Sequence, residues 1–186
     1  INLAPKTADY WASRATIYLT LGRDAQAAEN CRIALKHDEG NLIAYRTQAQ
    51  VRFKLGRYHE ALASVNKGLL VDSSDVRLWR LRAHVHGKAG NNASAISDLE
   101  AAVANDPSDA QAWNDLGHFL RLDNRPTEAL AAFNDAYKHD NESVEVNYNL
   151  GRVHLALGNA DNAKRAFDRV LQPSPAWLKA WWLARR

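Results

Sequence analysis

The segment VRLWRLRAHVHGKAGNNASAISDLEAAVANDP, residues 76–107, contains the local features that decide the fold. Its first part, Val76 to Lys88, has apolar residues at helical spacing. Gly90 then ends the helix, because glycine accepts the left-handed backbone conformation that closes a helix. A second helix is predicted from about Ala93 to Ala104, and Asp106–Pro107 stops it. The segment therefore predicts two antiparallel helices joined by a short turn, which is a helical hairpin.

The hairpin recurs with a 34-residue period, and four residue classes share that period. The four series are Ala27, Ala61, Ala95, Ala129 and Ala163; Gly22, Gly56, Gly90 and Gly158; Trp11, Tyr45, Trp79, Trp113 and Trp181; and Asp38, Asp72, Asp106 and Asp140. Asn124 stands in the glycine series, where asparagine tolerates the left-handed conformation best after glycine. Asn147 interrupts the aromatic series. Small residues two turns apart, such as Ala95 and Ala102, allow another helix to approach closely.

Composition narrows the class of protein. The chain has 186 residues, of which 46% are hydrophobic and 24% charged, and this balance is typical of a soluble globular protein. No apolar run is long enough for a transmembrane helix. The single cysteine, Cys31, excludes an internal disulfide, and no zinc-type spacing appears. The net charge of +3 is too small to require a nucleic-acid partner. Because the chain begins at Ile1 and has no methionine, we interpret it as a processed or excised fragment.

The four periodic residue series resemble the pattern of the tetratricopeptide repeat (TPR) family, whose units are helix pairs of about 34 residues. The match is clearest in the fourth repeat, at Trp113, Leu116–Gly117, Ala129, Phe133 and Ala136. The resemblance implies an all-α solenoid of five hairpins in a right-handed superhelix. The predicted organisation is an N-terminal linker at 1–7, repeats at 8–41, 42–75, 76–109, 110–143 and 144–177, and a sixth repeat or capping helix at 178–186.

Catalytic and metal-binding patterns are missing from the sequence. His59–Glu60 lacks the second histidine of a metalloprotease helix, and His84 and His86 lie on different faces of a helix. Cys31 occupies the slot filled by Val65, Leu99, Phe133 and Phe167 in the other repeats, so we expect a core thiol rather than a nucleophile. The tryptophans and tyrosines of the repeat are likewise expected in the core. The sequence predicts no enzyme, no cofactor and no metal site.

The resemblance also implies where a partner binds, because the first helix of each family repeat lines a concave groove. Carrying the family's groove positions over gives these candidate partner-binding residues: Arg46, Gln50, Phe53, Lys54, Arg77, Arg80, His84, Lys88, Asn114, His118, Tyr148, Arg152 and Trp182. In the second and third repeats these positions hold five basic residues and no acidic one. Arginine binds carboxylates bidentately, so such a strip suits an acidic peptide or polymer. The alternative is that these residues are an ordinary solvated helix surface.

Three functional hypotheses follow. The first is a non-catalytic interaction scaffold that binds a protein or peptide segment in the groove as part of a larger chain or assembly. The second is a TPR component of a bacterial envelope secretion or polysaccharide-export assembly that contacts an anionic polymer or a neighbouring subunit. The third, RNA binding, is disfavoured by the strict period and modest charge. The family's clamp for chaperone C-termini is not matched in any register.

The C-terminal end of the sequence is rich in tryptophan. Trp177, Trp181 and Trp182 crowd into six residues. We expect this end to meet a further repeat in the parent chain or to pair with another copy, since exposed apolar patches usually mark contact sites. No leader is visible in the sequence, so cytoplasmic and bacterial periplasmic locations both stay open.

Overall fold

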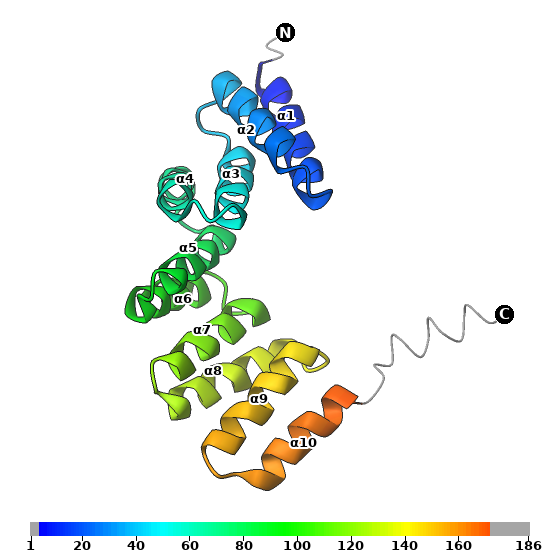
Figure 1. Cartoon of the computed structure of the whole chain (residues 1–186), viewed down its shortest axis with the longest axis vertical. Helices are drawn as coiled ribbons and strands as arrows, with labels where there is room; N and C mark the ends of the chain where they lie inside the picture. Colours follow the sequence, from blue (N-terminus) through cyan, green and yellow to red (C-terminus); the bar gives the residue numbers. More distant parts are fainter. Residues whose placement is uncertain (1–3, 172–186) are drawn as a thin grey trace, which may run out of the picture. The chain divides into compact units, whose positions relative to one another are not determined.

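The computed structural model describes residues 4–171 and folds them into ten α-helices, with no β-strand among these residues. Successive helices pair as five hairpins (Figure 1). The helices are α1 (Ala4–Thr20), α2 (Asp24–His37), α3 (Leu42–Lys54), α4 (Tyr58–Val71), α5 (Val76–Lys88), α6 (Asn92–Asn105), α7 (Ala110–Leu122), α8 (Pro126–His139), α9 (Val144–Ala156) and α10 (Ala160–Leu171). The predicted all-α repeat fold is confirmed. The helix expected from about Leu178 lies outside the described residues.

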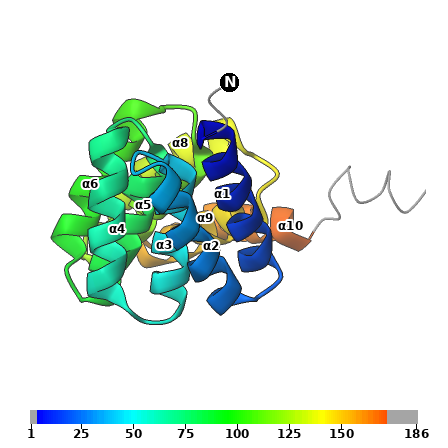
Figure 2. The same cartoon turned by 90° about the horizontal axis from the view of Figure 1, so that it is seen from above.

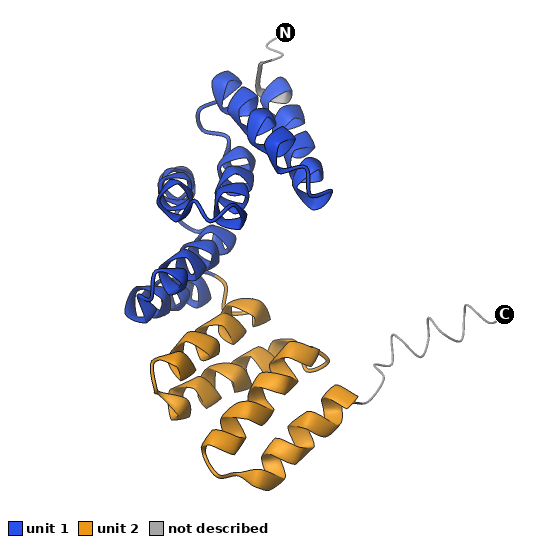
Figure 3. Cartoon of the chain, viewed as in Figure 1, with its two compact units in different colours: residues 1–105 blue, residues 106–186 orange. Residues whose placement is uncertain are grey.

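The chain divides into two compact units (Figure 3). The first unit, residues 1–105, contains α1 to α6, and the second unit, residues 106–186, contains α7 to α10. Inside each unit the first helices of successive hairpins contact one another, as α1 with α3, α3 with α5, and α7 with α9. Each second helix contacts the first helix of the next hairpin within its unit, so α3 lies between α2 and α4 (Figure 2).

No two second helices contact each other among the described helices of either unit. Because the first helices touch and the second helices do not, each row of hairpins bends with its first helices on the inner side. We call the surface of α1, α3 and α5 in the first unit, and of α7 and α9 in the second unit, the first-helix face. This is the side on which the groove was predicted.

Glycine and asparagine end the first helices as predicted. Gly22, Gly56, Gly90 and Gly158 have positive φ angles, and Asn124 takes the same conformation with φ of 60°. The following hairpin begins with a side-chain cap, because the residue before each of α3, α5, α7 and α9 accepts a hydrogen bond from a backbone N–H of the first turn. These caps are Asn41, Asp75, Asp109 and Ser143.

The aromatic series has a second role besides packing. Trp79 and Trp113 are half-buried, and each donates its indole N–H to a loop carbonyl six residues earlier, on Ser73 and Pro107, at 2.7 and 2.9 Å. Asn147, which interrupts the series, donates from its side-chain amide to the carbonyl of Asn141 at 2.9 Å. Asparagine therefore replaces the hydrogen bond of tryptophan although it cannot replace its apolar surface.

In the interior of each hairpin, a small residue of the first helix faces a residue of the second helix, and the volumes of the two side chains are complementary. The small residue is Ala15, Ala49 or Ala83 in the first unit and Gly117 or Gly151 in the second. Opposite the glycines are Phe133 and Phe167, whose rings occupy the space that a glycine Cβ would take. The cysteine, valine and leucine of the first three hairpins face alanine instead. Cys31 is fully buried, as predicted.

The N-terminal helix begins earlier than the repeat does. Helix α1 starts at Ala4, inside the segment 1–7 that the sequence predicts as a linker. Proline at position 5 is compatible with a first helical turn, and the next residues contain no helix breaker. Among residues 4–171, no helix has the combination of length and hydropathy needed to cross a membrane.

Candidate functional site

The predicted basic strip of the first unit is partly neutralised. The Nη2 atom of Arg46 lies 3.2 Å from Oδ2 of Asp75, and the Asp75 side chain is only 7% exposed. Lys54 forms an ion pair at 2.8 Å with Asp24, the first residue of α2. Both carboxylates lie outside the groove positions counted from the sequence. Two of the five cations of the predicted strip therefore have carboxylate partners from outside the groove positions.

The other predicted residues of the first unit differ in exposure. Gln50, Arg77 and Lys88 are exposed, while Arg80 and His84 are half-buried and engaged in further interactions. Phe53 is partly buried, with its ring centroid 5.7 Å from that of Tyr58. Of the basic residues predicted in the first unit, Lys54, Arg77 and Lys88 are thus exposed, whereas Arg46 and Arg80 are half-buried.

Polar side chains join neighbouring first helices along the first-helix face. In the first unit Asn41 donates to Asp9 at 2.8 Å, and the hydroxyls of Thr16 and Thr47 are 3.0 Å apart. In the second unit Asn114 of α7 plays this role toward α9, because it donates to Glu145 at 3.0 Å and accepts from Asn149 at 2.9 Å. Asn114 is 2% exposed. Asn114 was predicted as a partner-binding residue, but its amide holds α7 against α9 rather than facing solvent.

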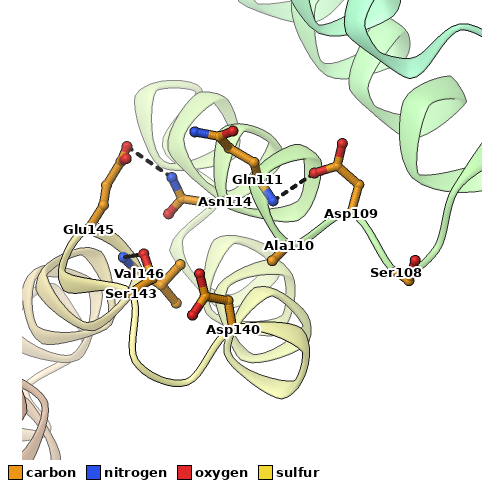
Figure 4. Close-up of a pocket in the computed structure, with 9 residues that line it drawn as sticks. All are labelled: Ser108, Asp109, Ala110, Gln111, Asn114, Asp140, Ser143, Glu145 and Val146. Atoms are coloured by element: carbon orange, nitrogen blue, oxygen red, sulfur yellow. Dashed lines mark hydrogen bonds between the residues drawn. The ribbon is translucent and has the colours of Figure 1, made fainter. Parts of the chain in front are cut away.

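One end of the first-helix face in the second unit is acidic. A pocket of about 420 Å³ opens where α7 and α9 begin and α8 ends (Figure 4). Its carboxylates belong to Asp109, Asp140 and Glu145. Figure 4 shows the Asn114 amide directed at Glu145, and the Asp109 carboxylate accepting the backbone N–H of Gln111 at 2.9 Å. The Asp109 carboxylate therefore caps α7, and the Glu145 carboxylate joins α9 to α7.

The other end of this face is basic. Arg121, near the end of α7, is half-buried, and burial together with the neighbouring charge of Arg152 on α9 lowers its pKa below the ordinary value. Neither arginine forms an ion pair with a carboxylate among residues 4–171. The guanidinium of Arg152 lies 5.8 Å from the ring centroid of Tyr148, which packs at 5.9 Å against Phe167. Two like charges and an exposed aromatic ring are thus brought together.

Tyr148 and Arg152 were predicted from the sequence, whereas Arg121 was not among the chosen candidates. The available signal was its repeat position, twelfth in the fourth repeat, which the family resemblance assigns to the groove. His118 is half-buried, with its ring 5.3 Å from that of Phe119 in an edge-on arrangement. Trp182 lies outside the described residues.

Two findings concern metal and thiol chemistry in the described part of the chain. No group of three or more His, Cys, Asp or Glu side chains among residues 4–171 is placed to hold a metal ion. Burial raises the pKa of the Cys31 thiol to about 12, so the thiolate is scarce at neutral pH. The first-helix face is instead a surface of charged, amide and aromatic side chains, which is suited to binding.

Comparisons with known proteins agree with this architecture. MamA from Desulfovibrio magneticus RS-1 is similar with a TM-score of 0.75 and 21% identity, and the match covers 89% of this chain and 93% of that chain. The structure of pilF from Pseudomonas aeruginosa matches with a TM-score of 0.86 and 18% identity over 92% of this chain and 78% of that chain. YrrB matches with a TM-score of 0.67 and 22% identity over 91% of this chain and 89% of that chain. YrrB is described as a TPR protein with an unusual peptide-binding site. No curated protein sequence matches this chain.

Two family models match the sequence directly. Both are described as tetratricopeptide repeat, and they match residues 80–144 and 120–186, so that together they span more than half of the chain. Proteins of this family bind protein or peptide partners and are typically non-catalytic scaffolds. The fixed repeat period, the five helical hairpins and these matches show that the chain belongs to the tetratricopeptide repeat family.

Proposed function

We propose that the first-helix face of the second unit binds a segment of a partner protein, with an acidic group of that segment placed between Arg121 and Arg152. The observation that carries this proposal is that Arg121 and Arg152 belong to the contacting helices α7 and α9, where the charge of one acts on the other, and that neither has a carboxylate partner among the described residues. Bringing two cations together costs free energy, which an anionic group between them offsets. Arginine is well suited to this role because its planar guanidinium binds carboxylates bidentately.

Apolar contacts complete the proposed surface. Tyr148 and Leu155 on α9 and Leu122 on α7 remain about half exposed. Aromatic and arginine side chains are the residue types that most often dominate binding energy at protein interfaces. A partner segment with one acidic and one apolar side chain therefore matches this end of the face.

The acidic pocket at the other end extends the proposed specificity. Glu145 and Arg152 are seven residues apart on α9, which corresponds to about 10 Å along the helix axis. An extended chain covers that length with about three residues. A segment that carries a basic residue about three positions from an acidic one would complement both ends.

The experiment is a selection of peptides from a random library against the full chain, followed by affinity measurements on variants. We expect selected peptides to be enriched in acidic and aromatic residues. They should lose at least tenfold in affinity for Arg121→Glu/Arg152→Glu, because the contact becomes repulsive. Arg23→Glu/Arg32→Glu, which makes the same charge change on exposed residues of the first unit, is the matched control. Equal binding to the two double variants would contradict the proposal.

A further inference from the structure

A second pocket of the second unit lies on another side of α9. It has a volume of about 280 Å³, and α8 and α10 form its walls while Leu150 and His154 of α9 form its floor. Leu150 is two positions from both Tyr148 and Arg152 of the first-helix face, and His154 is two positions from Arg152. Residues two apart in a helix point to different sides. The pocket is therefore separate from the surface proposed above.

The walls of this pocket carry positive charge. Arg165 and Arg169, one turn apart on α10, both line it, and no aspartate or glutamate does. Neither arginine pairs with a carboxylate among residues 4–171. The guanidinium of Arg169 lies 4.9 Å from the ring centroid of Tyr137 on α8, which fixes it across the opening by a cation–π contact. Side-chain amides of Asn134 and Asn162 add neutral hydrogen-bond donors.

The arginine pair is specific to this hairpin. The equivalent positions in the first four repeats hold Glu29 and Ile33, Ala63 and Lys67, Ser97 and Ala101, and Ala131 and Asp135. The corresponding pocket of the first unit, between α2, α3 and α4, contains Glu39, and its Arg52 is already bound to Ser64 and Glu60. Repeat architecture therefore does not by itself require two unpaired cations at these positions.

The floor of the pocket supplies an unsatisfied polar atom. The Nδ1 atom of His154 is buried and has no hydrogen-bond partner among the residues that the structure describes. Burial also lowers the pKa of His154, so the ring is neutral at neutral pH and the arginines carry the positive charge of the pocket. A buried polar atom without a partner costs free energy.

We propose that this pocket is a second binding site, which takes an oxyanion, a carboxylate or a phosphate group, between Arg165 and Arg169. Two guanidinium groups supply the forked donors that such anions accept. The volume is that of a small subsite and suits a single anionic group rather than a whole cofactor.

The test is an NMR titration of the labelled full chain at constant ionic strength, with inorganic phosphate in one arm and glutarate in the other. Sodium chloride is the reference titration. We expect saturable shifts of the Arg165 and Arg169 side-chain Nε–H signals and of the α10 amides in at least one arm. The arm that saturates at the lower concentration identifies phosphate or carboxylate as the preferred group.

Two double variants separate this site from the first-helix face. Arg165→Gln/Arg169→Gln should weaken anion binding at least tenfold, because two charge-assisted contacts are lost. Arg121→Gln/Arg152→Gln makes the same charge change on the first-helix face and should leave the α10 titration unchanged. Arg152, Arg165 and Arg169 are exposed and Arg121 is half-buried, so circular dichroism of both variants checks that the helices persist. Shifts no larger than those with chloride, or equal losses in the two variants, would overturn the proposal whatever the fate of the peptide-binding face.

Discussion

The contact between Gly117 and Phe133 allows a sharp test of the hairpin packing. A Cβ atom added to Gly117 would lie 2.7 Å from Cδ1 and Cε1 of Phe133 and 2.9 Å from Cζ. Carbon atoms in contact normally lie about 3.5–4.0 Å apart. Phe133 is fully buried, so its ring has no open space to enter. The ring or the helix must therefore move by about 1 Å, which in a close-packed interior is an overpacking strain.

Two opposing terms determine the effect of Gly117→Ala. Replacing a helical glycine by alanine stabilises a helix by about 1 kcal/mol. Overpacking a filled interior costs about 1–3 kcal/mol, and here a rigid aromatic ring is the obstacle. We expect the strain to exceed the propensity gain, with a net loss of about 1 kcal/mol. Thermal unfolding followed by circular dichroism should show a midpoint lower by about 2–4 °C.

The third hairpin supplies the rescue, because Ala83 and Leu99 occupy the same two positions and both are fully buried. In a Phe133→Leu background, Gly117→Ala recreates that pair and should become stabilising by up to about 1 kcal/mol. The sign of one substitution thus reverses with the size of its neighbour. If Gly117→Ala stabilises the parent protein, or has the same effect in both backgrounds, the packing argument is refuted.

Three further substitutions or conditions test other contacts. Ala95→Leu or Ala129→Leu, both at fully buried positions, should cost about 1–3 kcal/mol, measured as a lower unfolding midpoint. Asp98→Asn should cost about 1–3 kcal/mol, because the amide has no charge and can accept only one of the two hydrogen bonds of 3.0 and 2.7 Å that Arg82 donates, whereas Arg82→Leu/Asp98→Ala should be nearly neutral in thermal unfolding. Cys31 should resist alkylation at about pH 8 until the protein unfolds. The pKa of the Cys31 thiol is raised from 9.0 to about 12, so its neutral form stabilises the folded state. Denaturant titrations should show this contribution to the free energy of unfolding below pH 9.0, and should show it disappear as the pH rises toward 12.

The hairpin fold was predictable because its signals are local. Gly90 and Asn124 end helices through their own backbone preferences, and Ala95 or Ala129 marks close approach at a fixed position. The fixed period repeats these signals along the chain, so that each hairpin supports the interpretation of the next.

The charge balance of the candidate site was not predictable from the same signals. Arg46 lies in α3, and its partner Asp75 is the cap of α5, the first helix of the following hairpin. The pairing depends on how closely two first helices approach, which the repeat period does not give. Arg121 and Arg152 likewise belong to successive hairpins, and their proximity becomes evident only when α7 and α9 are placed side by side.

The two units also differ in the chemistry inside their hairpins. In the first unit, one interior pair of positions holds polar partners in every hairpin: Arg14 with Asn30, Gln48 with Ser64, and Arg82 with Asp98. In the second unit the same positions hold Leu116 with Ala132 and Leu150 with Ala166, all buried. The next pair of interior positions also differs between the two units. It holds alanine with cysteine, valine or leucine in the first unit, and glycine with phenylalanine in the second.

The arginines that close hairpins in the first unit have no arginine counterpart at the equivalent positions of the second unit. In the first three hairpins, Arg14, Arg52 and Arg82 are bound to side chains of their own hairpins, so their guanidinium donors are used in holding two helices together. In hairpins four and five, close-packed apolar contacts hold the two helices together, since a phenylalanine ring fills the space above each glycine. Arg121, Arg152, Arg165 and Arg169 are then not needed for hairpin closure. Both surfaces that we propose to bind an anionic group lie in the second unit.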